Sequence, residues 1–424
     1  MHQECAYMAS SFKEAVEKYA SYGVDVERAM DGAAKIPLSM HCWQGDDVGG
    51  FETPDSVLSG GGIQVTGNFP GKARNAEELR SDIAEALKFI PGRTRLNLHA
   101  IYGDFGGKRV DRNEISYKHF KAWVDWCSQM KMGMDFNPTY FSHPLAADGF
   151  TLSNRDKSVR DFWIEHGIAC RKIAEKAGKQ LGEAVIVNFW MPDGMKDIPA
   201  DLMGPRLRMK ESLDKIFSVK TSGKFEKDAL ECKLFGIGSE SYVVGSHEFF
   251  MGYVVSRGKM LTLDTGHFHP TESVADKVSS VLLFVPEILL HVSRGVRWDS
   301  DHVVLFDDPT RDLMREIVRS GATERVHIGM DFFDGSINRI FAWAVGMRSA
   351  RKALLSAFLE PGKKLLQAEN CGDYALRLAL MEESKTLPFA AVWEEFCRRH
   401  DVPNGLKMIE QIKRYERDVL SARS

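Results

Sequence analysis

Eight short apolar segments recur along the chain, and this recurrence is the feature that most constrains its fold. Most are rich in Val, Ile, Leu or Phe without strict alternation, which is typical of strands buried on both faces of a parallel sheet. Helical patterns lie between several of them, at 75–89, 117–130, 158–177 and 273–283. Strands that alternate with helices indicate parallel βα units, and eight such units predict an α/β fold, a closed (β/α)8 TIM-type barrel. The predicted strands are 36–40, 95–102, 132–136, 184–190, 230–235, 260–264, 287–292 and 325–331.

Helical segments are expected on both sides of this barrel. The first residues have the apolar periodicity of an amphipathic helix, so 1–35 is predicted to be an N-terminal helical segment. The catalytic barrel is predicted to span 36–355. A ninth apolar run, 302–306, is interpreted as part of the loop after the seventh strand. The remainder, 356–424, is helical in pattern and is predicted to form a C-terminal extension at subunit contacts.

The composition points to small molecules as ligands. A net charge of −3 over 424 residues gives no reason to expect nucleic acid or an anionic membrane as partner. The seven cysteines are scattered, odd in number and never in CxxC spacing, so neither a disulfide framework nor a thiolate zinc site is indicated. The start lacks the pattern of a secretory leader, and the longest apolar stretch, 281–292, is shorter than the about 20 residues that cross a bilayer. The cytoplasm is therefore the expected location.

Ligand-type residues follow the strand pattern through the second half of the chain. Each lies at or just after the end of an apolar segment, and steps of 33, 27 and 40 residues separate Glu231, Asp264, His291 and Asp331. One βα unit of a barrel is about 30 residues long, so this spacing predicts that the side chains meet on one rim. The full set is Glu231, Lys233, Asp264, His267, His291, Asp299, Asp301 and Asp331.

Each member of this set also has a simpler interpretation. Asp299 and Asp301 could form a solvated acidic turn, because Asp and Ser are ordinary turn residues. A lone histidine such as His267 is more often a hydrogen-bonded core residue than a ligand. Glu231 and Lys233 could form a salt bridge at a strand end.

The set as a whole favours metal over these separate interpretations. Its five carboxylates carry a charge of −5, which two divalent cations and Lys233 would balance. Without metal, converging carboxylates would repel one another and several would be protonated. Oxygen-rich ligand sets with one or two imidazoles suit Mn²⁺ or Mg²⁺ better than structural Zn²⁺. The sequence therefore predicts two divalent ions, provided that the residues converge.

Earlier strands add candidates for the substrate side of such a site. His99 and Trp190 lie at predicted strand ends, where the loops of a barrel carry function. Trp190 could offer an apolar platform to a sugar ring. It is equally well interpreted as a packing residue beneath the rim.

At these residues the chain closely resembles the L-rhamnose isomerase family, and the resemblance covers nearly the whole length. It implies a (β/α)8 barrel, a homotetramer and a centre of two divalent ions, usually Mn²⁺, with Mg²⁺, Co²⁺ or Zn²⁺ possible at one site. The motifs that carry it include PLSMHCWQGDDVGGFE, DFNPTYFSHPLAADGFTLS, DTGHFHPTE, LLHVSRGVRWDSDHVV and VHIGMDFFD.

The resemblance also implies a role for each candidate. Glu231, Asp264, His291 and Asp331 are similar to the family's structural-metal ligands. His267, Asp299 and Asp301 are similar to the catalytic-metal ligands. The residues implied on the substrate side are His99, Trp190, Lys233 and His267, and those implied in catalysis are Lys233, Asp331 and His99.

The implied reaction is the interconversion of L-rhamnose and L-rhamnulose in rhamnose breakdown, by a metal-assisted shift of hydrogen, as hydride, between C1 and C2. Two other enzyme classes stay open on the residues alone, a barrel metallohydrolase and an isomerase of another aldose. A non-catalytic sugar-binding protein on the same barrel is a third alternative, which the intact ligand set disfavours.

Overall fold

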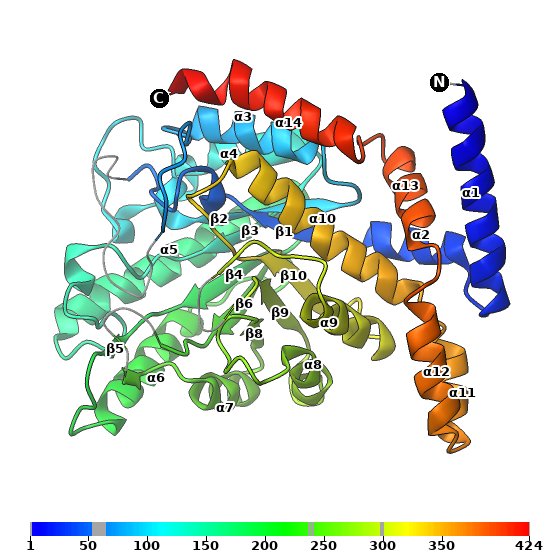
Figure 1. Ribbon diagram of the computed structural model, residues 1–424. Coiled ribbons are helices and arrows are strands. Elements are labelled where there is room, and N and C mark those ends of the chain that lie inside the picture. The colour runs from blue at the N-terminus through cyan, green and yellow to red at the C-terminus, as the bar shows by residue number, and fades with distance from the viewer. Residues whose placement is uncertain (1, 53–64, 236–238, 240, 297–300, 424) are drawn as a thin grey trace.

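The computed structural model describes residues 2–52, 65–235, 239, 241–296 and 301–423 (Figure 1). The predicted ligand Asp299 lies outside the described residues. Within them the chain forms a ring of parallel strands, helices outside the ring, and further helices from both ends of the chain.

Among the described residues, eight parallel strands close into a barrel, which confirms the predicted fold class. Their order around the ring is β1-β10-β9-β8-β6-β4-β3-β2. All eight predicted segments contribute a strand. The strands are β1 (Leu38–His41), β2 (Thr94–His99), β3 (Gly133–Asn137), β4 (Val185–Trp190), β6 (Glu226–Glu231), β8 (Met260–Asp264), β9 (Ile288–Val292) and β10 (Val326–Met330).

The prediction from sequence placed one strand wrongly and did not include a small second sheet. The strand predicted at 230–235 is β6, which begins at Glu226 and ends at Glu231, so the prediction lies four residues too late at each end. Glu226 and Asp228, two of its first three residues, are charged but buried, and Asp228 forms an ion pair of 2.7 Å with Arg171. The small sheet pairs β5 (Gly194–Met195) with β7 (Tyr242–Val243) in antiparallel fashion. The run 302–306 contains no named strand, as expected for a loop.

Helices link the strands and cover the barrel. The predicted helices at 75–89, 117–130, 158–177 and 273–283 correspond to α3, α4, α5 and α8, whereas α6, α7 and α9 were not predicted. The helices that follow the eight barrel strands in turn are α3 (Ala76–Leu87), α4 (Lys121–Gln129), α5 (Lys157–Leu181), α6 (Met203–Ser218), α7 (His247–Arg257), α8 (Val274–Leu282), α9 (Asp308–Arg319) and α10 (Arg339–Phe358).

The two chain ends pack together beside the barrel. A second apolar cluster joins Tyr19 and Met30 to Leu355 and Trp393. The last helix returns to the barrel, where Tyr415 donates a hydrogen bond of 2.7 Å to the carboxylate of an α3 residue. The terminal helices are α1 (His2–Ser21), α2 (Val26–Lys35), α11 (Gly362–Asn370), α12 (Tyr374–Ser384), α13 (Phe389–Arg399) and α14 (Leu406–Asp418). The boundaries at 35 and 355 stay predictions, and α10 runs through the second of them.

No helix in the described part of the chain combines the length and the apolar character that a membrane crossing requires.

Candidate metal centre

Four ligand-type side chains converge at the carboxyl ends of neighbouring strands. Glu231 ends β6, Asp264 ends β8, His291 lies in β9 and Asp331 directly follows β10. One ligand atom from each lies within 4.8 Å of the ligand atoms of the others. The His291 Nδ1 atom is 3.2 Å from Glu231 Oε2, 3.2 Å from Asp331 Oδ2 and 4.0 Å from Asp264 Oδ2. We call these four residues the rim cluster.

The rim cluster has the electrostatics of a cation site. Burial raises the pKa of Asp264 well above its ordinary range, and the neighbouring carboxylates of Glu231 and Asp331 raise it further. Burial disfavours the charged form of His291, but Glu231 and Asp331 outweigh burial and raise its pKa well above the ordinary value. Protons can therefore neutralise the cluster, and a divalent cation can do so in their place.

Unsatisfied polar atoms support the same assignment. Asp264 Oδ2 and His291 Nε2 are buried without a hydrogen-bond partner among the described residues. Buried polar atoms are normally hydrogen-bonded, so atoms that lack a partner require an explanation. Three carboxylates and an imidazole that share one small space fit a divalent metal ion, for which oxygen and nitrogen are suitable ligands.

Neighbouring polar groups orient the ligand carboxylates. Asn188 Nδ2 donates to Glu231 Oε2 at 2.5 Å, and Asn188 Oδ1 in turn accepts from Thr262 Oγ1 at 2.7 Å. Trp43 Nε1 donates to Asp331 Oδ1 at 3.1 Å. Such partners hold ligand atoms in place before metal binds. Trp43 follows a predicted strand end and was a sequence candidate, whereas Asn188 and Thr262 were missed, although the lone polar Asn188 within the apolar segment AVIVNFW was a usable signal.

Two residues of the second predicted ligand set lie beside the rim cluster. The His267 Nδ1 atom is 3.4 Å from Glu231 Oε1. A methyl group on the Cα of Gly266 would lie 3.2 Å from Asp264 Oδ1 and 3.3 Å from Asp301 Oδ1. Glycine at this position therefore leaves room for two carboxylates, one at the end of β8 and one in the segment between β9 and α9.

The predicted substrate-side residues form a largely aromatic wall on the first half of the barrel. The His99 ring lies 4.9 Å from the Trp43 ring and 5.6 Å from the Phe141 ring, and Phe141 lies 5.6 Å from Trp190. The ammonium group of Lys233 stands 4.8 Å from the centre of the Trp190 ring, a cation–π distance. Burial is the main reason that the pKa of His99 falls to about 3, so its imidazole is neutral at physiological pH.

A cavity opens beside two of these residues. Its volume is about 510 Å³, and Lys233 and His267 line it together with Arg206, His247 and Phe268. Small-molecule sites of about 300–1,000 Å³ are typical, so the cavity is large enough for a monosaccharide.

The sequence is similar to those of several named proteins and to one protein family. A sequence model of the L-rhamnose isomerase family matches residues 6–423. The L-rhamnose isomerase of Rhodopirellula baltica is 57% identical over 414 residues, which cover 98% of this chain and 96% of that protein. The L-rhamnose isomerase of Salmonella enteritidis is 55% identical over 417 residues, which cover 98% of this chain and 99% of that protein.

Similar solved structures include an L-ribulose 3-epimerase, with a TM-score of 0.48 and 11% identity over 76% of this chain and 95% of that one. This similarity is too low to support any conclusion about the chain.

Proposed function

Because the chain belongs to the L-rhamnose isomerase family, we propose that it is a metal-dependent ketol isomerase that interconverts L-rhamnose and L-rhamnulose. The observation that carries the proposal is the rim cluster, a buried group of carboxylates and an imidazole at the carboxyl ends of barrel strands. Barrel enzymes carry their chemistry at this end. In the forward direction C2 loses its hydrogen to C1, and the proton of the C2 hydroxyl ends on O1.

We propose two divalent ions per chain. Glu231, Asp264, His291 and Asp331 would hold one ion, and His267, Asp299 and Asp301 would hold the other. When bound, the ions supply Lewis-acid chemistry and a template for the two adjacent sugar oxygens. The oxygen-rich ligand set favours Mn²⁺, with Mg²⁺, Co²⁺ or Zn²⁺ as alternatives at one site.

The remaining residues would bind and orient the open sugar chain. Lys233 would stabilise negative charge that develops on a sugar oxygen, because its buried ammonium group is close to the rim. Trp190 would offer an apolar face to the sugar. His99, which is neutral, would contact a sugar hydroxyl by hydrogen bonding, and Asp331 would act in catalysis as well as in metal binding.

Isomerisation of a deuterated sugar tests the proposal directly. Metal-free protein is supplied with Mn²⁺ and L-rhamnose that carries deuterium at C2, and the product is read by NMR. We expect L-rhamnulose with the deuterium retained at C1, as a hydride shift requires. Loss of the deuterium to water would show that the hydrogen moves by proton transfer and not as a hydride. An unchanged sugar would overturn the isomerase proposal.

Two enzymatic alternatives are separated in the same assay. An isomerase of another aldose would convert a sugar such as L-lyxose or L-mannose with a higher kcat/KM than L-rhamnose. A metallohydrolase would leave every sugar unchanged and cleave an ester or amide in the presence of Mn²⁺.

We also propose a homotetramer in the cytoplasm. Helices α11 and α12 project from the barrel and expose Leu366, Tyr374, Leu376 and Leu378, apolar side chains that contact with another subunit would bury (Figure 1). The free cysteines include Cys42, Cys127, Cys170, Cys232, Cys371 and Cys397, and free thiols suit a reducing compartment. Light scattering should give four times the chain mass of 47.7 kDa, and a monomeric mass would exclude this assembly.

A further inference from the structure

An arginine that uses all of its hydrogen-bond donors lies behind the aromatic wall. Arg112, in the short helix η3 (Arg112–Glu114), is buried with 2% of its surface exposed. Its Nη1 group donates to the carbonyl oxygens of Thr139 at 2.7 Å and Phe141 at 2.5 Å, and its Nη2 group donates to that of Ser142 at 3.0 Å. Nε and Nη2 also donate to the Glu52 carboxylate at 3.0–3.2 Å. These contacts occupy all five N–H groups of the guanidinium group.

The segment that Arg112 holds touches the substrate side of the site. Thr139 Oγ1 is 3.1 Å from His99 Nδ1, and the Phe141 ring lies between His99 and Trp190. Ser142 has a φ of 52°, a left-handed conformation that is unusual for a residue with a side chain. Such a conformation persists when surrounding contacts enforce it, and Arg112 binds the carbonyl oxygen of this residue.

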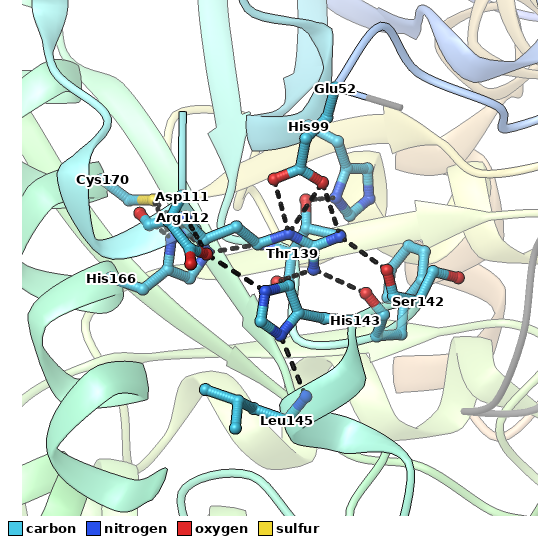
Figure 2. A network of polar contacts seen from close by, with 11 residues as sticks. Glu52, His99, Asp111, Arg112, Thr139, Ser142, His143, Leu145, His166 and Cys170 are labelled. Atoms are coloured by element: carbon cyan, nitrogen blue, oxygen red, sulfur yellow. Dashed lines mark hydrogen bonds and ion pairs between the residues drawn. The ribbon is translucent and has the colours of Figure 1, made fainter. Parts of the chain in front are cut away.

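His166 supports the same segment from helix α5. Its Nε2 accepts the backbone N–H of Thr139 at 3.0 Å, so this nitrogen carries no proton. Its Nδ1 therefore carries the proton and donates to the backbone oxygen of Arg112 at 2.9 Å. Burial, together with the charge of Arg112, lowers the pKa of His166 to about 3, so the ring stays neutral and keeps this tautomer. Figure 2 shows the ring between the two backbone groups.

We propose that Arg112 and His166 are positioning residues that set the sugar selectivity of the wall. They fix the backbone from Thr139 to Ser142, and this backbone places the Thr139 hydroxyl on His99 and the Phe141 ring against Trp190. The inference rests on the proposed function, in which His99 and Trp190 face the sugar. Lysine cannot replace Arg112, because it has three donors and no planar fork to reach three carbonyl groups and a carboxylate at once.

Three variants test the proposal: Arg112→Met, His166→Phe and the near-isosteric Thr139→Val. Displacement of a binding group by about 1 Å can cost about 100-fold in rate, so we expect kcat/KM for L-rhamnose to fall about 10- to 100-fold in the first two. The loss should appear mainly in KM. Discrimination between L-rhamnose and L-mannose, which differ only at C6, should weaken, while bound Mn²⁺ per folded chain stays at the wild-type value.

Thr139→Val removes only the hydroxyl contact to His99. Thr139→Val should raise KM by a smaller factor than the other two variants. It still tests the proposal if Arg112→Met and His166→Phe do not fold. His166→Gln retains one acceptor and one donor, so it should recover part of the activity that His166→Phe loses.

Arg171→Met is the matched control. Arg171 is another buried arginine that binds two carbonyl oxygens and two carboxylates, but near the amino end of β6. It should lose stability without a change in KM or selectivity. Wild-type KM and selectivity in folded Arg112→Met, His166→Phe or Thr139→Val would overturn the positioning role. Failure of the wild-type protein to isomerise L-rhamnose would instead overturn the proposed function.

Discussion

The two ends of the barrel neutralise their buried carboxylates in different ways. Toward the amino ends of the strands, Asp135 lies 2.8 Å from Arg95, and Asp228 lies 2.7 Å from Arg171. At the carboxyl ends, the described ion partners of the rim cluster carboxylates are imidazoles, those of His291 and His267. A guanidinium group is a permanent cation, whereas an imidazole is neutral when it binds metal. The amino end therefore carries its own cations, and we propose that the rim cluster takes its cation from solution.

Removal of one rim carboxylate should have the largest effect on activity. Glu231→Gln keeps the size of the side chain but removes the charge that lies between His267 and His291. Lewis-acid stabilisation amounts to several kcal/mol and about 1.4 kcal/mol is tenfold in rate, so kcat/KM should fall at least about 1,000-fold. Steady-state kinetics, metal analysis and circular dichroism check this. A folded variant with normal turnover would contradict the role of the cluster.

Removal of a cation from the opposite end should change stability instead. Arg171→Met leaves the buried carboxylates of Glu226 and Asp228 without their arginine. Loss of one partner of a buried ion pair costs about 3–5 kcal/mol, so the free energy of unfolding should fall by that amount. Urea unfolding measures the loss, and kcat per folded chain should stay at the wild-type value. A fall in kcat without a fall in the free energy of unfolding would contradict the claim that Arg171 contributes to stability and not to activity.

A smaller change at the rim should weaken metal binding without abolishing it. Trp43→Phe removes the N–H that holds Asp331 Oδ1 and keeps an aromatic ring. Such outer partners typically contribute 10–100-fold to metal affinity, so the Kd for Mn²⁺ should rise by about this factor. Trp123→Phe is the control, because its N–H donates to the backbone oxygen of Tyr102 and not to a rim cluster residue. Equal effects of the two substitutions would argue for general loosening of the core.

The smallest expected effect is a pH-dependent one at the amino end. The His327 and Lys227 side chains hold the pKa of Glu287 at about 2, below its ordinary value of 4.5. Because the folded state releases this proton more readily, the stabilisation is complete above about pH 4.5 and is lost as the pH falls toward 2. Glu287→Gln should therefore be less stable than wild type at pH 7, and the difference should shrink at pH 3. A difference of equal size at both pH values would exclude the ion pair as its cause.

The convergence of the rim cluster could be predicted from the sequence because each of its residues lies at or next to the end of a strand. Parallel strands of similar spacing bring their carboxyl ends to one rim, so Glu231, Asp264, His291 and Asp331 converge as expected. The start of β6 was less predictable, because Glu226 and Asp228 look like surface residues until Arg171 is placed beside them.

The supporting residues are harder to find in a sequence. Arg112 binds carbonyl oxygens of residues 139–142, and His166 binds a backbone N–H of the same segment. These interactions use backbone groups, which every residue has, so the sequence carries no complementary side chain that would reveal the pairing. Asn188 and Thr262 pair through side chains, but 74 residues separate them.

Titration of metal-free protein with Mn²⁺, followed by electron paramagnetic resonance, tests the central claim most directly. The two proposed ligand sets predict saturable binding of two ions per chain, with activity restored in proportion to occupancy. The Glu231→Gln variant should lose saturable binding of the ion assigned to the rim cluster, while Arg171→Met should bind two ions as the wild type does. Full activity in metal-free protein, or identical Mn²⁺ binding by wild type and Glu231→Gln, would contradict the claim that the rim cluster is a metal centre.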